Sequence, residues 1–353
     1  MPLHNHIDGN VLKEQMKKSV EPRITLSFYQ YTHLNNPTFF RDYLYQQWSD
    51  LGVLGRAYVA KEGINAQISV PRASFESFES GLRDVTFLEH VRLNQAVEDN
   101  GKSFFKLKIK VKEKIVADGL DDESFDVTDR GQHLDAEAFN QLTEQPDTVV
   151  VDMRNHYESE VGHFENAWLP DVDTFRESLP IVADTLKDKQ EQPIVMYCTG
   201  GIRCEKASAY LKHHGFKNVY QLEGGIIKYA HDVKEKGLKN KFRGKNFVFD
   251  ERLGERISNE ILSQCHQCGA PCDTHTNCRN EACHLLFIQC DSCAARYKGC
   301  CSADCREFMQ LPEEEQKVHR QRKATQRNVF RKGRASHLKE KAAGRRLPTK
   351  KSE

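Results

Sequence analysis

An apolar strand that runs directly into a cysteine and two glycines constrains the fold of this chain more than any other feature. In the segment IVMYCTGGIRC (194–204), Cys198 ends the strand and a helix is expected to begin at Ile202. Continuously apolar strands are typical of parallel sheets that helices cover on both faces, and the active sites of such sheets lie at the carboxyl ends of their strands. The segment therefore predicts a parallel α/β domain with Cys198 in its active site.

The loop after this strand has the composition of an anion-binding cradle. Thr199, Gly200, Gly201 and Ile202 follow Cys198, and the glycines let the backbone curl so that its N–H groups point inward at a helix N-terminus. Such surroundings lower the pKa of a cysteine from ~8.5 to roughly 3.5–7.5, so we predict that Cys198 is a nucleophile at neutral pH. The alternative is an inert cysteine buried at a strand end, which would not need these glycines.

The pattern around this loop extends over residues 132–240. TVVVDMR, PIVMYC and VYQLEGG are expected strands, and TFRESLPIVADTL and IRCEKASAYLKHHG are expected helices. Arg203 lies five positions after Cys198, so four residues separate them, whereas cysteine phosphatases carry five. The shorter loop suits a terminal sulfur or an attacked carbon better than a tetrahedral phosphate, and phosphatase activity is disfavoured.

A different pattern precedes this domain. After an N-terminal segment (1–22), residues 23–120 carry strand and helix signals in the order β-α-β-β-α-β, which predicts a ferredoxin-like, acylphosphatase-like α+β domain. Its last expected strand is FFKLKIKVKEKIV. The acidic stretch DGLDDESFDVTDRG (118–131) has the composition of a linker, which we place at 121–131. Many nucleic-acid-binding modules use an open sheet of this kind, so substrate docking is a hypothesis for this domain.

These motifs resemble the rhodanese superfamily. Asp152, Arg154, Glu158, Gly162 and His163 fit that family's D-x-R-x-x-x-E-x-x-x-G-H pattern, C-x-x-G-x-R fits its loop, and LEGGI (222–226) resembles its closing turn. The resemblance implies a cysteine that can carry a persulfide, with the loop from Cys198 to Arg203 stabilising the outer sulfur.

The resemblance extends beyond this domain. GRAYVAKEGINAQISV, FRGKNFVFDER and a cysteine-rich C-terminal module occur together in the bacterial tRNA uridine(34) hydroxylases, which carry a rhodanese domain. Membership of that family implies that the chain acts on tRNA, uses molecular oxygen and installs 5-hydroxyuridine at the wobble position. An oxidoreductase of this kind would modify tRNA in the cytoplasm.

The reactive thiol suggests how uracil could be activated. A thiolate that adds at C6 makes C5 nucleophilic, while Arg203 or the loop amides stabilise the charge on oxygen. Cys204 is a candidate resolving thiol for an oxidised or persulfidic Cys198, or equally a small core residue. No G-x-G-x-x-G follows a strand, so neither a flavin nor a nicotinamide site of the Rossmann type is expected.

Ten of the twelve cysteines lie between Cys265 and Cys305, inside an expected module at 241–310. Two C-x-x-C pairs, 21 residues apart, predict a structural Zn²⁺ site. Its four ligands are Cys265, Cys268, Cys290 and Cys293. Further candidates make a second ion conceivable without assigning its ligands, namely Cys272, Cys278, Cys283, Cys300, Cys301, Cys305, His266, His275 and His284.

Charge is segregated along the chain. Residues 317–351 hold 14 Lys/Arg and a single acid, Glu340. They lie within an expected basic, flexible tail at 311–353. Such a tail suits contact with phosphate backbones, or it simply solubilises the protein. No stretch approaches the ~18 apolar residues of a membrane span, and the N-terminus lacks the apolar core of a signal peptide. The chain is thus expected in the cytoplasm.

Two other functions are compatible with parts of the sequence. A sulfurtransferase that passes persulfide sulfur from Cys198 to a thiol acceptor or a nucleobase would need only the rhodanese loop. A non-catalytic RNA-binding or zinc scaffold would need the basic and cysteine-rich segments, but not Cys198 together with Gly200, Gly201 and Arg203.

Overall fold

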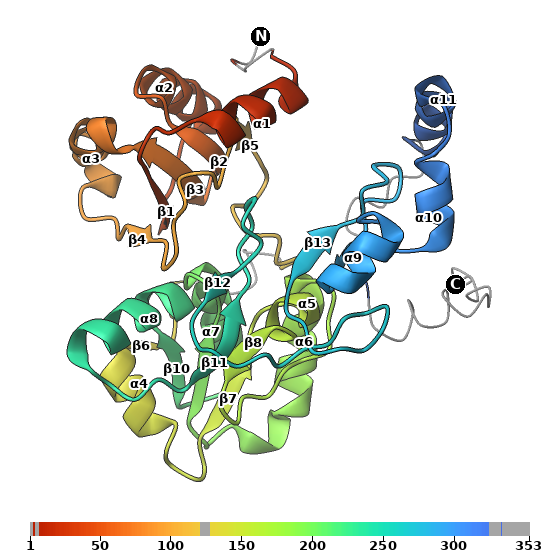
Figure 1. Ribbon diagram of the computed structural model, residues 1–353. Helices are drawn as coiled ribbons and strands as arrows, with labels where there is room; N and C mark the ends of the chain where they lie inside the picture. Colours follow the sequence, from red (N-terminus) through yellow and green to blue (C-terminus); the bar gives the residue numbers. More distant parts are fainter. Residues whose placement is uncertain (1–2, 4–6, 121–127, 325–332, 334–353) are drawn as a thin grey trace.

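The computed structural model describes residue 3, residues 7–120, residues 128–324 and residue 333 (Figure 1). It contains an N-terminal sheet with helices, a parallel α/β domain below it and a cysteine-rich region beside both. Within the described residues, no helix combines the length and apolar character needed to cross a membrane.

The N-terminal domain is a five-stranded sheet in the order β4-β1-β3-β2-β5. Its elements are β1 (Arg23–Tyr31), α2 (Pro37–Asp50), β2 (Leu54–Ala60), β3 (Gly63–Pro71), α3 (Phe75–Arg83), β4 (Asn94–Gln95) and β5 (Leu107–Val111), preceded by α1 (Gly9–Lys18). The predicted α+β class is confirmed. The expected last strand is shortened to β5, which pairs in parallel with β2 at the far edge, and the two-residue β4 lies next to β1 instead.

Strand β1 shows why α2 and α3 cover only one face of this sheet. Leu26 and Phe28 are buried against Trp48 of α2 and Phe78 of α3, while the alternate residue Tyr29 is half-buried on the opposite face. Side chains alternate between the two faces of a strand, so both helices cover one face. The opposite face carries polar and aromatic side chains.

The second domain is the predicted parallel α/β domain. Its main sheet has the order β6-β10-β9-β7, and every pairing is parallel. Its elements are β6 (Gln132–Leu134), α4 (Ala136–Leu142), β7 (Val149–Asp152), α5 (His156–Ser159), β8 (Gly162–Phe164), α6 (Phe175–Thr185), β9 (Ile194–Tyr197), α7 (Ile202–His213), β10 (Val219–Leu222) and α8 (Gly225–Lys236). All four residues of β9 are buried, because core clusters lie on both faces of the sheet.

The C-terminal region begins by extending this domain. Strand β11 (Phe242–Asn246) pairs antiparallel with β8, and His266 Nε2 lies 2.9 Å from Glu160 Oε1 at the end of α5. The remaining elements are β12 (Glu255–Arg256), β13 (His275–Asn277), β14 (Leu286–Ile288), α9 (Asp291–Tyr297), α10 (Ala303–Phe308) and α11 (Glu313–Ala324). Helix α11 lies within the expected basic tail at 311–353, whose flexibility stays a prediction. Most of the basic tail lies outside the described residues.

A buried ion-pair cluster joins the two larger domains. Lys206 Nζ on α7 lies 2.6 Å from Glu62 Oε2 in the β2–β3 turn and 2.5 Å from Asp118 Oδ2. The side chains of Lys206 and Asp118 are 1% and 0% exposed. Asp118, the first residue of the acidic stretch, therefore belongs to the domain junction and lies outside the linker placed at 121–131. Residues 121–127 of the expected linker lie outside the described residues.

We expect Lys206→Met to lower the free energy of unfolding by about 3 kcal/mol, because it removes the buried cation that Glu62 and Asp118 share and leaves Asp118 paired with Lys114 alone. Chemical denaturation would measure this loss. Lys212→Met is the matched control on the same helix, since Lys212 pairs with the exposed Asp129 and its loss should cost about 0.5 kcal/mol or less. Equal losses in both variants would show that the buried cluster does not stabilise the junction.

Candidate active site

The loop after β9 has the geometry predicted for an anion cradle. Cys198 follows the last strand residue, α7 begins at Ile202, and Gly201 has a φ of 100°. A Cβ at Gly201 would lie 2.8 Å from the Tyr29 hydroxyl. Only glycine meets both conditions, because it tolerates positive φ and leaves room for a residue from the other domain.

The Cys198 thiol is surrounded by groups that stabilise its ionised form. It is fully buried, and burial alone would raise its pKa. Hydrogen bonds from the Cys204 thiol and the backbone amides of Arg203 and Gly201, together with the positive charge of Arg203, outweigh burial and lower the pKa to about 6. The Gly201 nitrogen lies 3.1 Å from the sulfur. At neutral pH the thiolate is the main form, as a nucleophile requires.

Cys204 lies in the first turn of α7 and is also fully buried. Burial and the neighbouring Cys198 raise its pKa well above the usual value, so its thiol stays protonated and donates to the Cys198 sulfur. Its position in the hydrophobic core suits the packing role, and its contact with Cys198 suits the resolving role. The resolving role stays a prediction.

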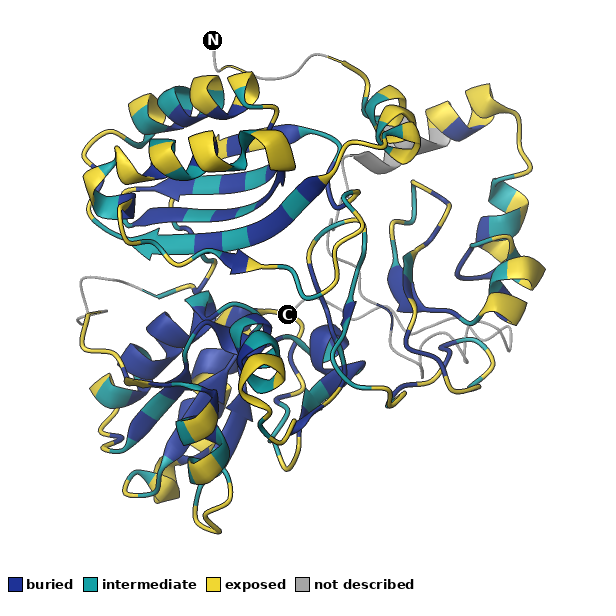
Figure 2. Cartoon of the chain, turned by 60° about the vertical axis from the view of Figure 1, so that its left-hand side comes forward, coloured by how far each residue is buried: buried dark blue, intermediate teal, exposed yellow. Residues whose placement is uncertain are grey.

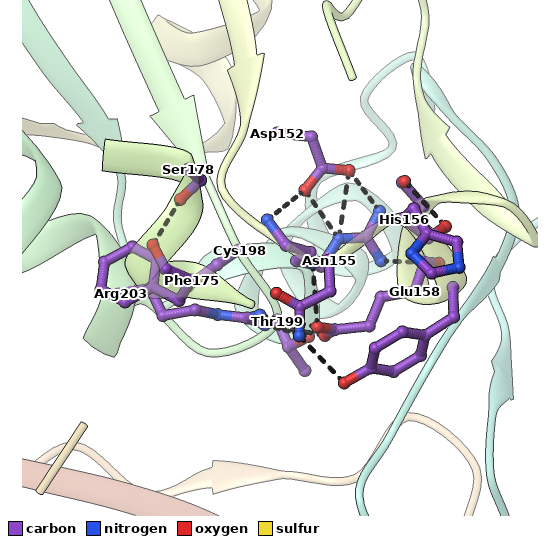
Figure 3. A network of polar contacts seen from close by, with 12 residues as sticks. Asp152, Asn155, His156, Glu158, Phe175, Ser178, Cys198, Thr199 and Arg203 are labelled. Carbon is purple, nitrogen blue, oxygen red and sulfur yellow. Dashed lines mark hydrogen bonds and ion pairs between the residues drawn. The ribbon is translucent and has the colours of Figure 1, made fainter. Parts of the chain in front are cut away.

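Arg203 is held away from solvent by a bidentate ion pair. Its Nη1 and Nη2 atoms lie 2.7 and 2.8 Å from the two carboxylate oxygens of Glu158, whose side chain is 0% exposed (Figure 3). Thr199 Oγ1 lies 3.5 Å from the same Nη2. Because Glu158 engages both terminal nitrogens, the charge of Arg203 acts on Cys198 from a fixed position. The loop amides are then the better candidates for binding a substrate oxygen.

The remaining motif residues build the frame under Glu158. Arg154 Nη2 lies 2.6 Å from Asp152 Oδ2 and 2.6 Å from the Gly162 carbonyl oxygen, and both charged side chains are buried. The Asn155 amide donates to Glu158 and closes a capping box on α5. His163 is half-buried on β8, with Nδ1 3.0 Å from the Phe164 carbonyl oxygen. These residues thus hold the segment that carries Glu158.

The sequence did not reveal that the N-terminal sheet contacts this loop. Tyr31 Oη lies 3.4 Å from the Ile202 carbonyl oxygen, and Asn94 Nδ2 lies 3.5 Å from the Gly200 carbonyl oxygen. Tyr29 lies over Gly201, as described above. The side-chain alternation of β1 could have predicted this contact, because it puts Tyr29 and Tyr31 on the face opposite α2 and α3.

Glu205, directly after Cys204, fixes Tyr29 in this position. Its Oε1 accepts a hydrogen bond of 2.8 Å from Tyr29 and lies 3.0 Å from His133 Nε2. Its Oε2 accepts from Arg130 and Gln221 at 3.0 and 3.2 Å. Burial opposes ionisation of Glu205, but His133, Arg130 and Tyr29 lower its pKa overall. A charged carboxylate therefore orients the tyrosine beside the loop.

Two sets of four cysteines lie in the C-terminal region, and in each set all four sulfurs lie within 4.8 Å of one another. The first set is the predicted one: Cys265, Cys268, Cys290 and Cys293. The second set is Cys278, Cys283, Cys301 and Cys305. Sets of four thiols are the donor group that Zn²⁺ prefers in structural sites.

The other candidate ligands have different contacts. Cys272 Sγ accepts from the Thr274 amide, and Cys300 Sγ lies 4.0 Å from the Lys298 carbonyl oxygen. His266 bonds to Glu160, and the His275 ring packs against Phe247. These four residues, and His284, lie outside both four-cysteine sets. The spacing of cysteines and histidines in the sequence could not show that these five residues lie outside the two sets.

The low pKa of Cys198 can be tested by its thiolate absorbance. The ultraviolet difference between the native protein and Cys198→Ser should rise with pH and reach half its maximum near pH 6, because the thiolate forms above the pKa. Cys204→Ala should move this midpoint to higher pH by removing a donor, while Cys204→Ser keeps a hydroxyl donor and should move it less. A midpoint near the ordinary pKa in the native protein would contradict the arrangement.

Three family models match successive parts of the chain. The UPF0176 acylphosphatase-like domain matches residues 23–115, the rhodanese-like domain matches 135–232, and the rhodanase C-terminal model matches 243–306. Among solved structures, a rhodanese-like domain from Anabaena is 20% identical, with a TM-score of 0.26, over 32% of this chain and 78% of that one.

Curated relatives match almost the whole chain. A protein of Photorhabdus laumondii named tRNA uridine(34) hydroxylase is 57% identical over 333 residues, which cover 94% of this chain and 95% of the relative. The protein of that name from Yersinia pestis (strain Pestoides F) is 58% identical over 331 residues, 94% of this chain and 93% of the relative. The resemblance inferred from the motifs is confirmed, and the chain belongs to the tRNA uridine(34) hydroxylase family.

Proposed function

We propose that this protein hydroxylates uridine 34 of tRNA to 5-hydroxyuridine, with molecular oxygen as co-substrate and Cys198 as the nucleophile. The observation that carries the proposal is a buried cysteine with a pKa of about 6 in a chain that shares 57–58% identity with named tRNA uridine(34) hydroxylases over nearly its full length. Because tRNA is its substrate, we place the protein in the cytoplasm.

In the proposed reaction, the Cys198 thiolate adds to C6 of uracil. The S–C6 bond forms while the electrons of the C5–C6 double bond move into an enolate that ends on O4. Carbon C5 is then nucleophilic and takes one atom of dioxygen. Loss of the C5 proton and expulsion of the thiolate restore the ring, and reduction of the second oxygen atom to water consumes two electrons and two protons from a reductant.

The residues around Cys198 have different roles in this reaction. The Gly201 amide and the Cys204 thiol hold the sulfur as thiolate before attack, and the charge of Arg203 supports them. Arg203 in turn depends on Glu158 for its position. Once the sulfur is bonded to C6, the loop amides would stabilise the enolate oxygen.

A sulfurtransferase activity is the second candidate, because a low-pKa thiol in a loop of this length also suits a persulfide. The two functions differ in what they add to RNA. Hydroxylation adds an oxygen atom and depends on air, whereas thiolation adds sulfur and depends on a sulfur donor.

We also propose that each four-cysteine set holds one Zn²⁺ ion. The cysteines of the two sets alternate in pairs along the chain, so the ions would brace the segments between them against each other. A module with so small a hydrophobic core gains much of its stability from such bonds. The basic segment 317–351, which follows this module, would then contact the phosphate backbone of tRNA.

Mass spectrometry of nucleosides tests the proposed activity. Purified protein incubated with tRNA and a thiol reductant in air should add one oxygen to uridine, and neither anaerobic incubation nor Cys198→Ser should do so. Cys272→Ser, at a buried cysteine outside both sets, is the matched control and should retain activity. A gain of sulfur that depends on thiosulfate would replace the proposal by sulfur transfer.

The zinc proposal predicts two ions per chain by atomic emission. Cys265→Ser and Cys301→Ser should each lose one ion and lower the unfolding temperature, because each removes a thiolate from a different set. Cys300→Ser, which changes a cysteine outside the sets, should keep both ions. A stoichiometry of zero or one in the native protein would overturn the assignment.

A further inference from the structure

The face of the N-terminal sheet opposite α2 and α3 carries two rows of side chains that lead to the catalytic loop. Cross-strand partners in a sheet point to the same face, so paired residues define a row. The first row is Lys108, Arg56, Gln67, Ser27 and Asn94, from β5 to β4. The second row is Lys110, Tyr58, Asn65 and Tyr29, from β5 to β1.

Both rows end at the loop that holds Cys198. Asn94 contacts the Gly200 carbonyl, Ser27 Oγ lies 3.8 Å from the position of a Cβ on Gly200, and the Tyr29 hydroxyl lies over Gly201. Strands in a sheet lie about 4.8 Å apart, so each row extends roughly 14 Å from β5 to β1. Figure 2 shows the alternation of buried and less buried residues along these strands.

Positive charge gathers at the far end of the rows. Lys108 and Lys110 are exposed on β5, while Leu107 and Ile109 between them are buried in the core. Partial burial and repulsion from Lys106, Lys110 and Arg56 lower the pKa of Lys108. Among the described residues, no carboxylate forms an ion pair with Lys108 or Lys110. Crowded cations of this kind suit a polyanionic partner.

Aromatic rings lie among these cations. Tyr58 is half-buried in the second row, and Lys112 Nζ lies 6.0 Å from its ring centre. The Phe249 carbonyl accepts a hydrogen bond from Arg56, and 41% of Phe249 is exposed. Single-stranded RNA is recognised mainly by aromatic side chains that stack on bases and by cations along the backbone.

We infer that this sheet face binds the single-stranded anticodon loop of the substrate, with phosphates at Lys108, Lys110 and Arg56, a neighbouring base on Tyr58, and the target uridine at the Cys198 end. The inference rests on the proposed function and deepens it. Between these two ends, Gln67 Nε2 donates to Asn65 Oδ1 at 2.6 Å and Asn65 Nδ2 donates to the Ile115 carbonyl oxygen at 3.1 Å, so Asn65 orients Gln67, whose carbonyl oxygen can accept from a base edge. A sheet of this arrangement would thus position the target base as well as bind RNA.

The test measures binding separately from catalysis. All variants are made in full-length Cys198→Ser protein, and the probe is a fluorescently labelled RNA hairpin with the anticodon-loop sequence and uridine at the wobble position. Lys108→Glu/Lys110→Glu should raise Kd at least tenfold and reduce the slope of log Kd against log salt by about 1 to 2, since two phosphate contacts are lost. If the glutamate pair fails to fold, Lys108→Gln/Lys110→Gln gives the same test.

Lys187→Glu/Lys189→Glu is the matched control. These two exposed lysines have the same spacing and lie before β9, at the opposite end of that strand from Cys198, so their reversal should leave Kd within about twofold. Tyr58→Ala should raise Kd about fivefold or more, while Tyr58→Phe keeps the ring and should bind like the parent.

The outcomes separate the docking surface from the activity. If the parent binds the hairpin and both lysine pairs weaken binding equally, the docking inference is wrong although the proposed function stands. If the β5 pair alone weakens binding but the native enzyme adds no oxygen to uridine, the surface stands and the proposed function fails. If the parent does not bind the hairpin, the docking inference is wrong, and the proposed function is decided by whether the native enzyme adds oxygen to uridine.

Discussion

A buried negative charge on Cys198 is the constraint on which the surrounding structure depends. A thiolate without access to water is costly unless donors and positive charge surround it. The Gly201 amide, the Cys204 thiol and the charge of Arg203 meet that need. Arg203 is also buried, so Glu158 must balance it, and the frame beneath Glu158 follows from that requirement. In the rhodanese pattern, each buried charge is therefore paired with a neighbouring buried charge of opposite sign.

The N-terminal domain completes the site. It brings Tyr29 and Asn94 to the loop, and Glu205 and Lys206 of α7 bind it at two points, the Tyr29 hydroxyl and the Glu62 carboxylate. Glu205 and Lys206 directly follow Cys204 in the sequence. Helix α7 thus begins beside the Cys198 thiol and also binds the N-terminal sheet. A shift of either domain would therefore move the residues of the loop.

The cysteine-rich region is tied to the same centre from the other side. His266 bonds to Glu160 at the end of α5, two residues after Glu158, and Cys265 packs in one cluster with Tyr157 of that helix. Folding of this region around its thiols would therefore stabilise the short helix that carries the partner of Arg203. This connection gives the region a structural reason to accompany the rhodanese domain.

The sequence by itself determined the parts that depend on local patterns: the buried strand before Cys198, the helix from Ile202, the β-α-β-β-α-β order and the pairing of Cys265 and Cys268 with Cys290 and Cys293. These follow from side-chain periodicity, glycine conformation and ligand spacing, which act over a few residues. Only the tertiary structure decided that Tyr29 lies over Gly201, that Asp118 belongs to a buried ion cluster, and that Cys278 and Cys283 join Cys301 and Cys305. Contacts of this kind link residues distant in sequence, and they depend on how whole domains pack, which no local pattern records.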